Sequence, residues 1–241
     1  MTDLAIPDRV LAVGAHPDDV ELQCGGTLAK WAAAGTEITI CALTDGSKGT
    51  WDPGADLEDL VEGRYQEQLA AAAALGGATV WRRLGFVDGE LTGDRREQEA
   101  VCEVIRAVRP DIVLGHDPWK RYRLHPDHQL AGQVTIAAVV AARDPHFFPG
   151  RGTPHRPRSL LLFEAEVVDH VEDVTTTLET KVTALLCHES QWQSTFGIDP
   201  HAPDPVAARA AFAERLRAEA AAAGAPAGIA LGEGFKLIQP L

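Results

Sequence analysis

The chain has 241 residues, of which 45% are hydrophobic and 24% are charged, so it is long enough to bury the core of one sizeable α/β domain. Its 35 acidic residues outnumber its 22 basic residues and give a formal net charge of -13. A surface with that charge repels phosphate backbones and anionic lipids, so neither nucleic acid nor a membrane is an expected partner.

The cysteines and the first residues of the chain predict the compartment. The 4 cysteines are scattered and form no CxxC pair, which is typical of buried, reduced thiols rather than of a zinc ribbon. The first residues lack a basic stretch followed by an apolar run, and no segment has the ~20 apolar residues that span a bilayer. We therefore expect a cytoplasmic protein without a signal peptide.

The first part of the chain alternates between strand and helix patterns. A buried strand over Val10–Ala15, a helix over Thr27–Ala34 that follows Gly25-Gly26, and a β-branched strand over Glu37–Leu43 predict a βαβ unit. The next predicted elements are a helix over Leu60–Leu75, a short strand over Thr79–Trp81, a helix over Asp94–Val108 and a strand over Asp111–Gly115.

The alternation continues before the pattern becomes less regular from about residue 165. The later predicted elements are a helix over Pro126–Ala142, a strand over Ser159–Phe163, and helices over Thr175–Cys187 and Pro205–Ala223. Repeated α and β elements of this kind predict a doubly wound, Rossmann-like and mostly parallel sheet with helices on both faces. No linker divides the chain, so we expect a single domain over residues 1–241.

Two clusters of histidine and aspartate follow strands of this predicted sheet. The first strand runs directly into HPDD at 16–19, and the strand at 111–115 delivers His116 and Asp117 to the same edge. HPDH at 125–128 then opens a helix. Sites in open α/β sheets form at the carboxyl ends of strands, so the fold is expected to bring the clusters together.

The combination of these clusters favours a metal site. Singly, each has a structural explanation, because aspartates cap helices and occupy solvated turns. Catalytic zinc commonly takes three imidazole or carboxylate ligands and leaves one position for water. His16, Asp19 and His128 could supply that set, which leaves Asp18 and His125 for proton transfer.

HPDDVE at 16–21 together with HPDH at 125–128 resembles the PIG-L/LmbE-like family of N-deacetylases. The resemblance extends over most of the chain, from about residue 8 to about residue 195. Its further matches are TDG at 44–46, Arg64-x-x-Glu67, Leu75-Gly76, and Lys181 followed by HESQ at 188–191.

The resemblance implies roles for individual residues. His16, Asp19 and His128 would bind zinc, and Asp18 would be the general base. His125 would be the second catalytic group, oriented by Asp127. The implied activity is the zinc-dependent hydrolysis of an N-acetyl group on an amino sugar or a sugar-containing small molecule.

The implied mechanism follows from the chemistry of these groups. Zinc lowers the pKa of bound water towards ~7, and Asp18 would accept the water proton as the water attacks the acetyl carbonyl. Zinc and protonated His125 would stabilise the oxyanion. Either Asp18 or His125 would then protonate the departing amine.

Four residues are candidates for binding the N-acetylated substrate: Arg64, Tyr122, His188 and Gln191. Arg64 has two interpretations, because on a helix it can pair with Glu67 three residues on or face the pocket. A structural role at a helix end is equally open for His188 and Gln191. Related proteins also suggest a homo-oligomer.

Three alternatives remain open at this point. A nucleotide-binding oxidoreductase is disfavoured, because the first turn carries acidic groups where G-x-G-x-x-G would bind phosphate. A non-catalytic protein that keeps the metal site and an amidase for a larger amide conjugate are both compatible with the motifs. Iron, cobalt or nickel would also suit a site of nitrogen and oxygen ligands.

Overall fold

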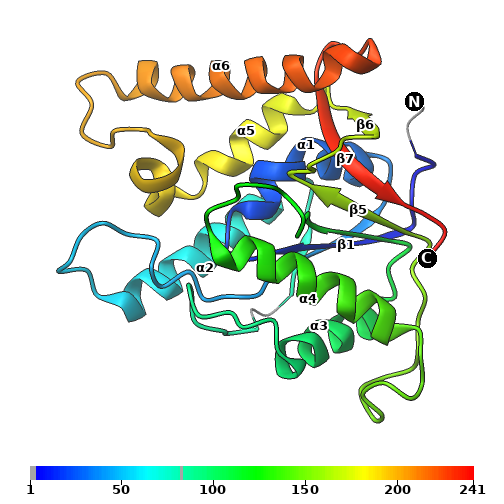
Figure 1. Cartoon of the computed structure of the whole chain (residues 1–241). Coiled ribbons are helices and arrows are strands. Elements are labelled where there is room, and N and C mark those ends of the chain that lie inside the picture. The colour runs from blue at the N-terminus through cyan, green and yellow to red at the C-terminus, as the bar shows by residue number, and fades with distance from the viewer. Residues whose placement is uncertain (1–3, 82–83) are drawn as a thin grey trace.

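The computed structural model describes residues 4–81 and 84–241, which build one sheet with helices around it (Figure 1). The strands of the described residues are β1 (Arg9–Gly14), β2 (Glu37–Ala42), β3 (Thr79–Val80), β4 (Ile112–His116), β5 (Ser159–Phe163), β6 (His170–Asp173) and β7 (Gly232–Ile238). The helices are α1 (Asp19–Ala33), α2 (Leu57–Ala74), α3 (Arg95–Val108), α4 (Pro126–Ala142), α5 (Leu178–Leu186) and α6 (Pro205–Gly224). Shorter helical turns are η1 (Glu189–Gln191), η2 (Trp192–Phe196) and η3 (Ala225–Ala227).

The sheet has the order β3-β2-β1-β4-β5-β7-β6. The first five strands pair in parallel, whereas β7 runs antiparallel to both β5 and β6. The chain moves outward from β1 in one direction to β2 and β3 and in the other direction to β4 and β5. The predicted doubly wound, mostly parallel fold is therefore confirmed.

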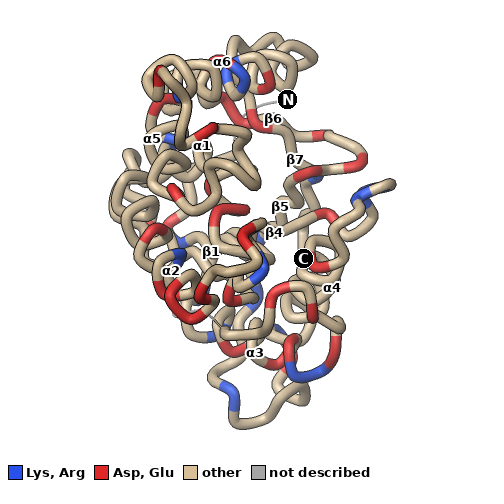
Figure 2. Tube along the Cα trace, turned by 90° about the vertical axis from the view of Figure 1, so that its left-hand side faces the viewer, with Lys and Arg blue, Asp and Glu red and all other residues tan. Residues whose placement is uncertain are grey.

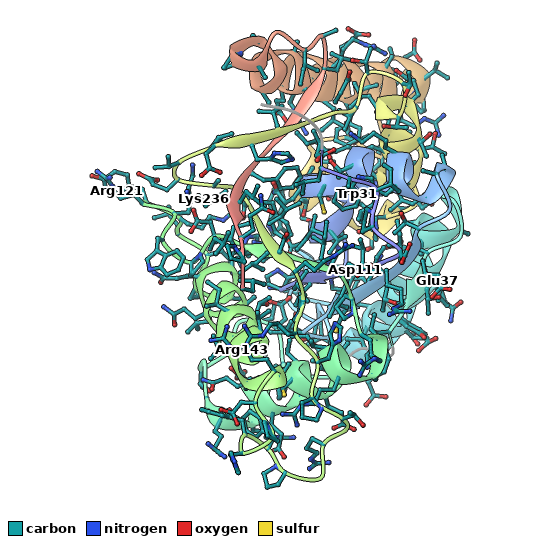
Figure 3. All side chains as sticks on the ribbon, turned by 90° about the vertical axis from the view of Figure 1, so that its right-hand side faces the viewer. Trp31, Glu37, Asp111, Arg121, Arg143 and Lys236 are labelled. Carbon is teal, nitrogen blue, oxygen red and sulfur yellow. The ribbon has the colours of Figure 1, made fainter. Side chains whose placement is uncertain are left out.

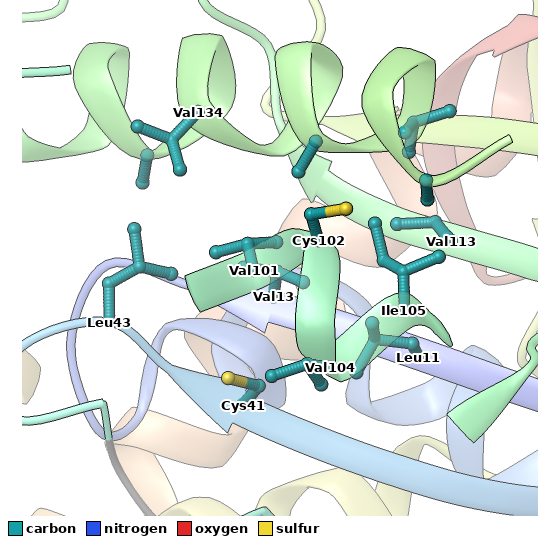
Figure 4. Packing of buried hydrophobic residues seen from close by; sticks show 14 of the residues in the cluster. Leu11, Val13, Cys41, Leu43, Val101, Cys102, Val104, Ile105, Val113 and Val134 are labelled. Atoms are coloured by element: carbon teal, nitrogen blue, oxygen red, sulfur yellow. The ribbon is translucent and has the colours of Figure 1, made fainter. Parts of the chain in front are cut away.

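Successive side chains of the central strands point to opposite faces of the sheet and pack into two hydrophobic cores, one on each face. On one face, Leu11, Val13 and Val113 pack with α3 and α4 (Figure 4). On the other face, Val10 and Ile112 pack with α1, α2 and α5. Buried parallel strands need cover on both faces, which explains their nearly continuous apolar sequences.

Helix α1 begins eight residues earlier than the sequence predicted, at Asp19 rather than at Thr27. Cys24 interrupts it with a non-helical φ of -142°. At this kink the Glu233 carboxylate of β7 accepts hydrogen bonds from the backbone N–H groups of Gly26 (3.0 Å) and Thr27 (2.8 Å). Gly25-Gly26 thus marks the start of the second segment of α1. The free N–H groups at this start are capped by β7, a strand that is far away in the sequence.

The C-terminal part contains two strands that the sequence analysis missed, β6 and β7. The β7 strand inserts between β5 and β6, and Lys181 of α5 forms a buried ion pair with its Glu233 at 2.7 Å. The C-terminal part thus joins the same sheet as the rest of the chain. This supports a single domain, although the domain boundaries remain a prediction. No helix of the described residues has both the length and the apolar character needed to cross a membrane.

Arg106 on α3 is 4% exposed, and within the described residues its guanidinium donates to backbone carbonyls. Its acceptors are those of Ala141, Ala142, Asp144, Phe147, Phe148 and Arg151. They belong to the end of α4 and the loop behind it, where carbonyls lack helical partners.

We predict that Arg106→Met lowers the free energy of unfolding by about 3 kcal/mol, because it leaves several buried carbonyls without donors. Urea unfolding monitored by circular dichroism measures this loss. Arg151→Met is the matched control on the same loop. Its side chain is half exposed and pairs with Glu99, so this change should matter much less. Equal losses in the two variants would contradict the role of Arg106.

Candidate metal centre and active site

The HPDD segment and the end of β4 meet where the strand order reverses between β1 and β4. Figure 2 looks onto this carboxyl edge and shows acidic residues gathered beside β1 and β4. Figure 3 shows the opposite side, where Glu37 and Asp111 mark the amino ends of β2 and β4. Ligands of doubly wound sheets bind at such a reversal, outside the carboxyl ends of the strands.

The turn between β1 and α1 aims its two aspartates in different directions. Asp18 has a φ of 105°, a left-handed conformation that aspartate tolerates better than most residues. Asp19 follows as the first residue of α1, and its Oδ2 accepts the backbone N–H of His16 at 2.8 Å. This bond fixes the Asp19 carboxylate beside the His16 ring.

His16, Asp19 and His128 lie together, with one ligand atom of each within 4.8 Å of the others. His16 Nδ1 is 3.4 Å from Asp19 Oδ2, and His128 Nε2 is 3.3 Å from Asp19 Oδ1. All three residues are buried. Two imidazoles and a carboxylate at this spacing form a donor set that suits zinc or a similar divalent cation.

The Asp19 carboxylate is ionised despite its burial. Burial alone would raise its pKa, but the neighbouring His128 and His116 hold the pKa of Asp19 well below its usual range. His116 Nε2 lies 3.3 Å from Asp19 Oδ2. A charged carboxylate surrounded by imidazoles is the form that a cation requires.

Asp18 precedes Asp19 in the same turn, but its surroundings disfavour the ionised carboxylate. Burial raises the pKa of Asp18 to about 6, against the opposing effect of Arg64. The backbone N–H of Asp18 donates to Gln68 at 3.3 Å. Asp18 lines the cavity and is not part of the three-residue cluster, so its carboxylate remains available for proton transfer.

Arg64 lies at the cavity, as one of its two interpretations required, and it does not pair with Glu67 in the described residues. Its guanidinium donates to the carbonyls of Pro17 (2.6 Å) and Gly46 (2.8 Å) and lies 3.4 Å from Asp18 Oδ2. Glu67, the alternative partner, instead binds the hydroxyl and backbone N–H of Ser190. Arg64 therefore ties together the turns after β1 and β2 and also lines the cavity.

Asp127 was expected to orient His125, but the structure pairs it with His16 instead. Asp127 Oδ2 lies 3.2 Å from His16 Nε2 and accepts the backbone N–H of Gly89 at 2.7 Å. Because α4 begins at Pro126, Asp127 points inward and is fully buried, whereas His125 before it stays exposed. The His125 ring lies 4.7 Å from that of His16. Partial burial and the charge of His16 lower the pKa of His125, so its resting form is neutral.

A cavity of about 640 Å³ lies over this cluster. Of the predicted substrate-binding residues, Arg64, Tyr122 and Gln191 line it. His188 does not, because it is fully buried behind the HPDD turn, where its Nε2 lies 3.7 Å from Glu21 Oε2. The expectation that His188 contacts substrate is corrected accordingly.

Two residues near the cluster were missed by the sequence analysis, Asp88 and Glu164. Asp88 Oδ1 lies 3.2 Å from His16 Nε2, and Glu164 Oε2 lies 2.9 Å from His116 Nδ1. Glu164 directly follows β5, and Asp88 follows the bridge between Thr44 and Phe86. Their positions after strands at the carboxyl edge were the available signal.

Comparison with known proteins finds related deacetylases. The model of the PIG-L family, described as GlcNAc-PI de-N-acetylase, matches residues 11–139. Diacetylchitobiose deacetylase of Thermococcus kodakarensis is 35% identical over 188 residues, which cover 76% of this chain and 70% of that protein. The 1D-myo-inositol 2-acetamido-2-deoxy-alpha-D-glucopyranoside deacetylase of Actinosynnema mirum is 36% identical over 163 residues, 58% of this chain and 57% of that protein.

A solved structure gives the same result. The N,N'-diacetylchitobiose deacetylase of Pyrococcus horikoshii superposes with a TM-score of 0.85 and 27% identity, over 97% of this chain and 84% of that one. The chain therefore belongs to the PIG-L family. It is an N-deacetylase, a hydrolase of the class that these relatives represent.

The raised pKa of Asp18 predicts a pH dependence of stability in the metal-free protein. The unfolded carboxyl ionises near pH 4 and the folded one near pH 6. Between these values the folded state binds the extra proton, so stability falls as pH rises, by about 3 kcal/mol in total. Asp18→Asn should therefore become more stable than the unmodified protein as pH rises through this window.

Urea unfolding in the presence of a chelator, at about pH 4.5 and pH 7.5, measures the difference. Asp19→Asn is the control, because its effect on stability should have the opposite sign. The pKa of Asp19 is lowered in the folded state, so losing this charge should destabilise the protein at pH 7.5. A stability difference for Asp18→Asn that does not grow with pH would contradict the prediction.

Proposed function

We propose that the chain is a zinc-dependent deacetylase that removes the N-acetyl group from an amino sugar or a sugar-containing small molecule. The observation that carries this proposal is the His16–Asp19–His128 cluster beside a separate, buried Asp18 at one cavity. The names of the relatives supply the substrate class, since they act on diacetylchitobiose or on an acetamido sugar linked to inositol.

The metal would be held by His16 Nδ1, the Asp19 carboxylate and His128 Nε2. A divalent cation bound there supplies Lewis-acid polarisation of the acetyl carbonyl and acidifies water. On the far side of the His16 ring, Asp127 and Asp88 accept from Nε2. These contacts leave the Nδ1 lone pair of His16 directed at the metal position.

Asp18 would act as the general base. A carboxyl with a pKa of about 6 is mostly ionised at neutral pH and is more basic than an ordinary aspartate. It takes a proton from water as the water attacks the acetyl carbon. Arg64 holds the turn that carries Asp18 through the Pro17 carbonyl.

The departing amine needs a proton, and Asp18 is the better donor of the two candidates. It has just received the water proton, and burial stabilises its neutral form. His125 has a lowered pKa and is neutral at rest. In this proposal His125 faces the acetyl oxygen as a second catalytic group. Asp127 pairs with His16, and its charge opposes the lowering of the His125 pKa.

The cavity suits a small molecule. About 640 Å³ lies within the ~300–1,000 Å³ typical of small-molecule sites. Tyr122 is 88% exposed and offers an aromatic face to a sugar ring. Arg64 and Gln191 also line the cavity, where their side chains hold the surrounding loops through the carbonyls of Gly46 and Gly49. Hydrolysis of a larger amide conjugate is the second candidate, because the cavity is open beside exposed Tyr122 and Leu124.

Other assignments stay predictions. The 4 cysteines are free, which supports a reducing, cytoplasmic compartment. A homo-oligomer is the remaining partner prediction.

Asp18→Asn is predicted to lower kcat for acetate release from N-acetylated sugars by about 100-fold or more, because general-base catalysis contributes at least that much. The variant should still bind zinc, since the ligand cluster is intact. A panel of N-acetylglucosamine, diacetylchitobiose and a larger N-acyl conjugate would distinguish the two candidate functions. Asp144→Asn, which removes a charge from an exposed turn behind α4, is the control. Full activity of Asp18→Asn would refute the role of Asp18 as the base.

Metal removal gives an independent prediction. Dialysis against a chelator should abolish acetate release, and stoichiometric zinc should restore it in the unmodified protein. His128→Ala should bind zinc at least about 10-fold more weakly, because it removes one of three ligands. Chelator-treated protein that keeps its activity would exclude metal-dependent hydrolysis.

A further inference from the structure

Glu164 lies behind the proposed metal centre and contacts three cationic or ionisable side chains. Its Oε2 is 2.9 Å from His116 Nδ1 and 3.3 Å from His128 Nδ1, and its Oε1 is 2.9 Å from Arg123 Nη1. Its side chain is 11% exposed. A carboxylate in contact with the free nitrogen of a metal-ligating histidine determines which nitrogen carries the proton.

The two nitrogens of His128 face different groups. Nε2 faces Asp19 Oδ1 at 3.3 Å and hence the metal position. Nδ1 faces away from that position, towards Arg123 and Glu164. A metal takes the lone pair of Nε2, so the ring must then carry its proton on Nδ1.

Without a metal, Arg123 favours the other tautomer. Arg123 Nε donates to His128 Nδ1 at 3.1 Å, which requires a lone pair on Nδ1. The ring proton then lies on Nε2, from which it can donate to Asp19. That tautomer presents an N–H to the metal position and cannot act as a ligand.

We propose that Glu164 is a positioning residue that accepts the Nδ1 proton of His128 and so holds its metal-binding tautomer, whereas Arg123 holds the metal-free tautomer. This inference rests on the proposed metal centre. When a metal binds, the ring proton leaves Nε2 and a proton occupies Nδ1, so His128 contributes no net proton release. Arg123 keeps its ion pair with Glu164 Oε1 but gives up its bond to His128.

His116 holds Glu164 in place from the other side. His116 Nδ1 donates to Glu164 Oε2 at 2.9 Å, while its Nε2 lies 3.3 Å from Asp19 Oδ2 and 3.2 Å from the backbone nitrogen of Ala15. The carboxylate is therefore anchored between β4 and β5, independently of His128.

A second cation site is the competing explanation for this cluster, because His116, His128 and Glu164 also have metal-ligand spacing. The guanidinium of Arg123 contacts both His128 Nδ1 and Glu164 Oε1. The Arg123 guanidinium thus already occupies the position at which a second cation would have to balance the Glu164 carboxylate. Two metals would also have to share both nitrogens of His128.

The test is zinc affinity measured by competition with a chromophoric chelator, which needs no turnover. Glu164→Gln should weaken zinc binding by about 10-fold or more, the usual effect of losing such a partner. Arg123→Gln should strengthen it, because both the competing donor and a like charge near the cation are removed. Glu166→Gln is the matched control. Glu166 lies on the same loop as Glu164 but forms its ion pair with Arg121, and among the described residues it has no ion pair with a histidine. This variant should leave the affinity unchanged.

The tautomer itself can be observed by 15N NMR of the zinc-loaded, unmodified protein, which should show His128 protonated on Nδ1. Protonation on Nε2, an unchanged affinity in Glu164→Gln, or a weakened one in Arg123→Gln would overturn the inference. A second zinc equivalent bound with comparable affinity in the unmodified protein would also overturn it. Failure of the unmodified protein to bind any zinc would instead refute the proposed function.

Discussion

The Asp19 carboxylate is the charge around which the site is organised. It receives the backbone N–H of His16 and lies within 3.4 Å of nitrogens from three imidazoles, those of His16, His116 and His128. These rings come from the turn after β1, the end of β4 and the start of α4. A buried carboxylate is costly unless charges or hydrogen bonds compensate it, and here the compensating groups are also the proposed metal ligands and their neighbours.

The sheet makes this convergence possible. Parallel pairing of β1 with β4 brings two strand ends to one edge, and the reversal of strand order leaves a space between their following helices. Helix α4 approaches β4 closely at Gly132, where an added Cβ would lie 2.6 Å from the His116 carbonyl. This close packing brings the rings of His116 and His128 to 4.3 Å.

Local sequence carried much of this information. Strand-then-motif patterns located the HPDD turn and its neighbours at the correct edge, because the position after a buried parallel strand is fixed by topology. Contacts between residues far apart in the sequence could not be predicted from local patterns. The position of β7 depends on its pairing with β5, and Glu233 caps α1 from 206 residues away. Asp127 pairs with His16 rather than with its neighbour His125, since the direction of a side chain depends on where α4 begins.

The capping of α1 by β7 has a consequence for how the protein matures. The proposed metal ligands His16, Asp19 and His128 all precede β7 by about 100 residues or more, but the second segment of α1 is capped at Gly26 and Thr27 by Glu233 of β7. On the ribosome, these residues therefore emerge long before the strand that supplies the cap. The cap on the second segment of α1 can therefore form only after the C-terminal strand has been synthesised.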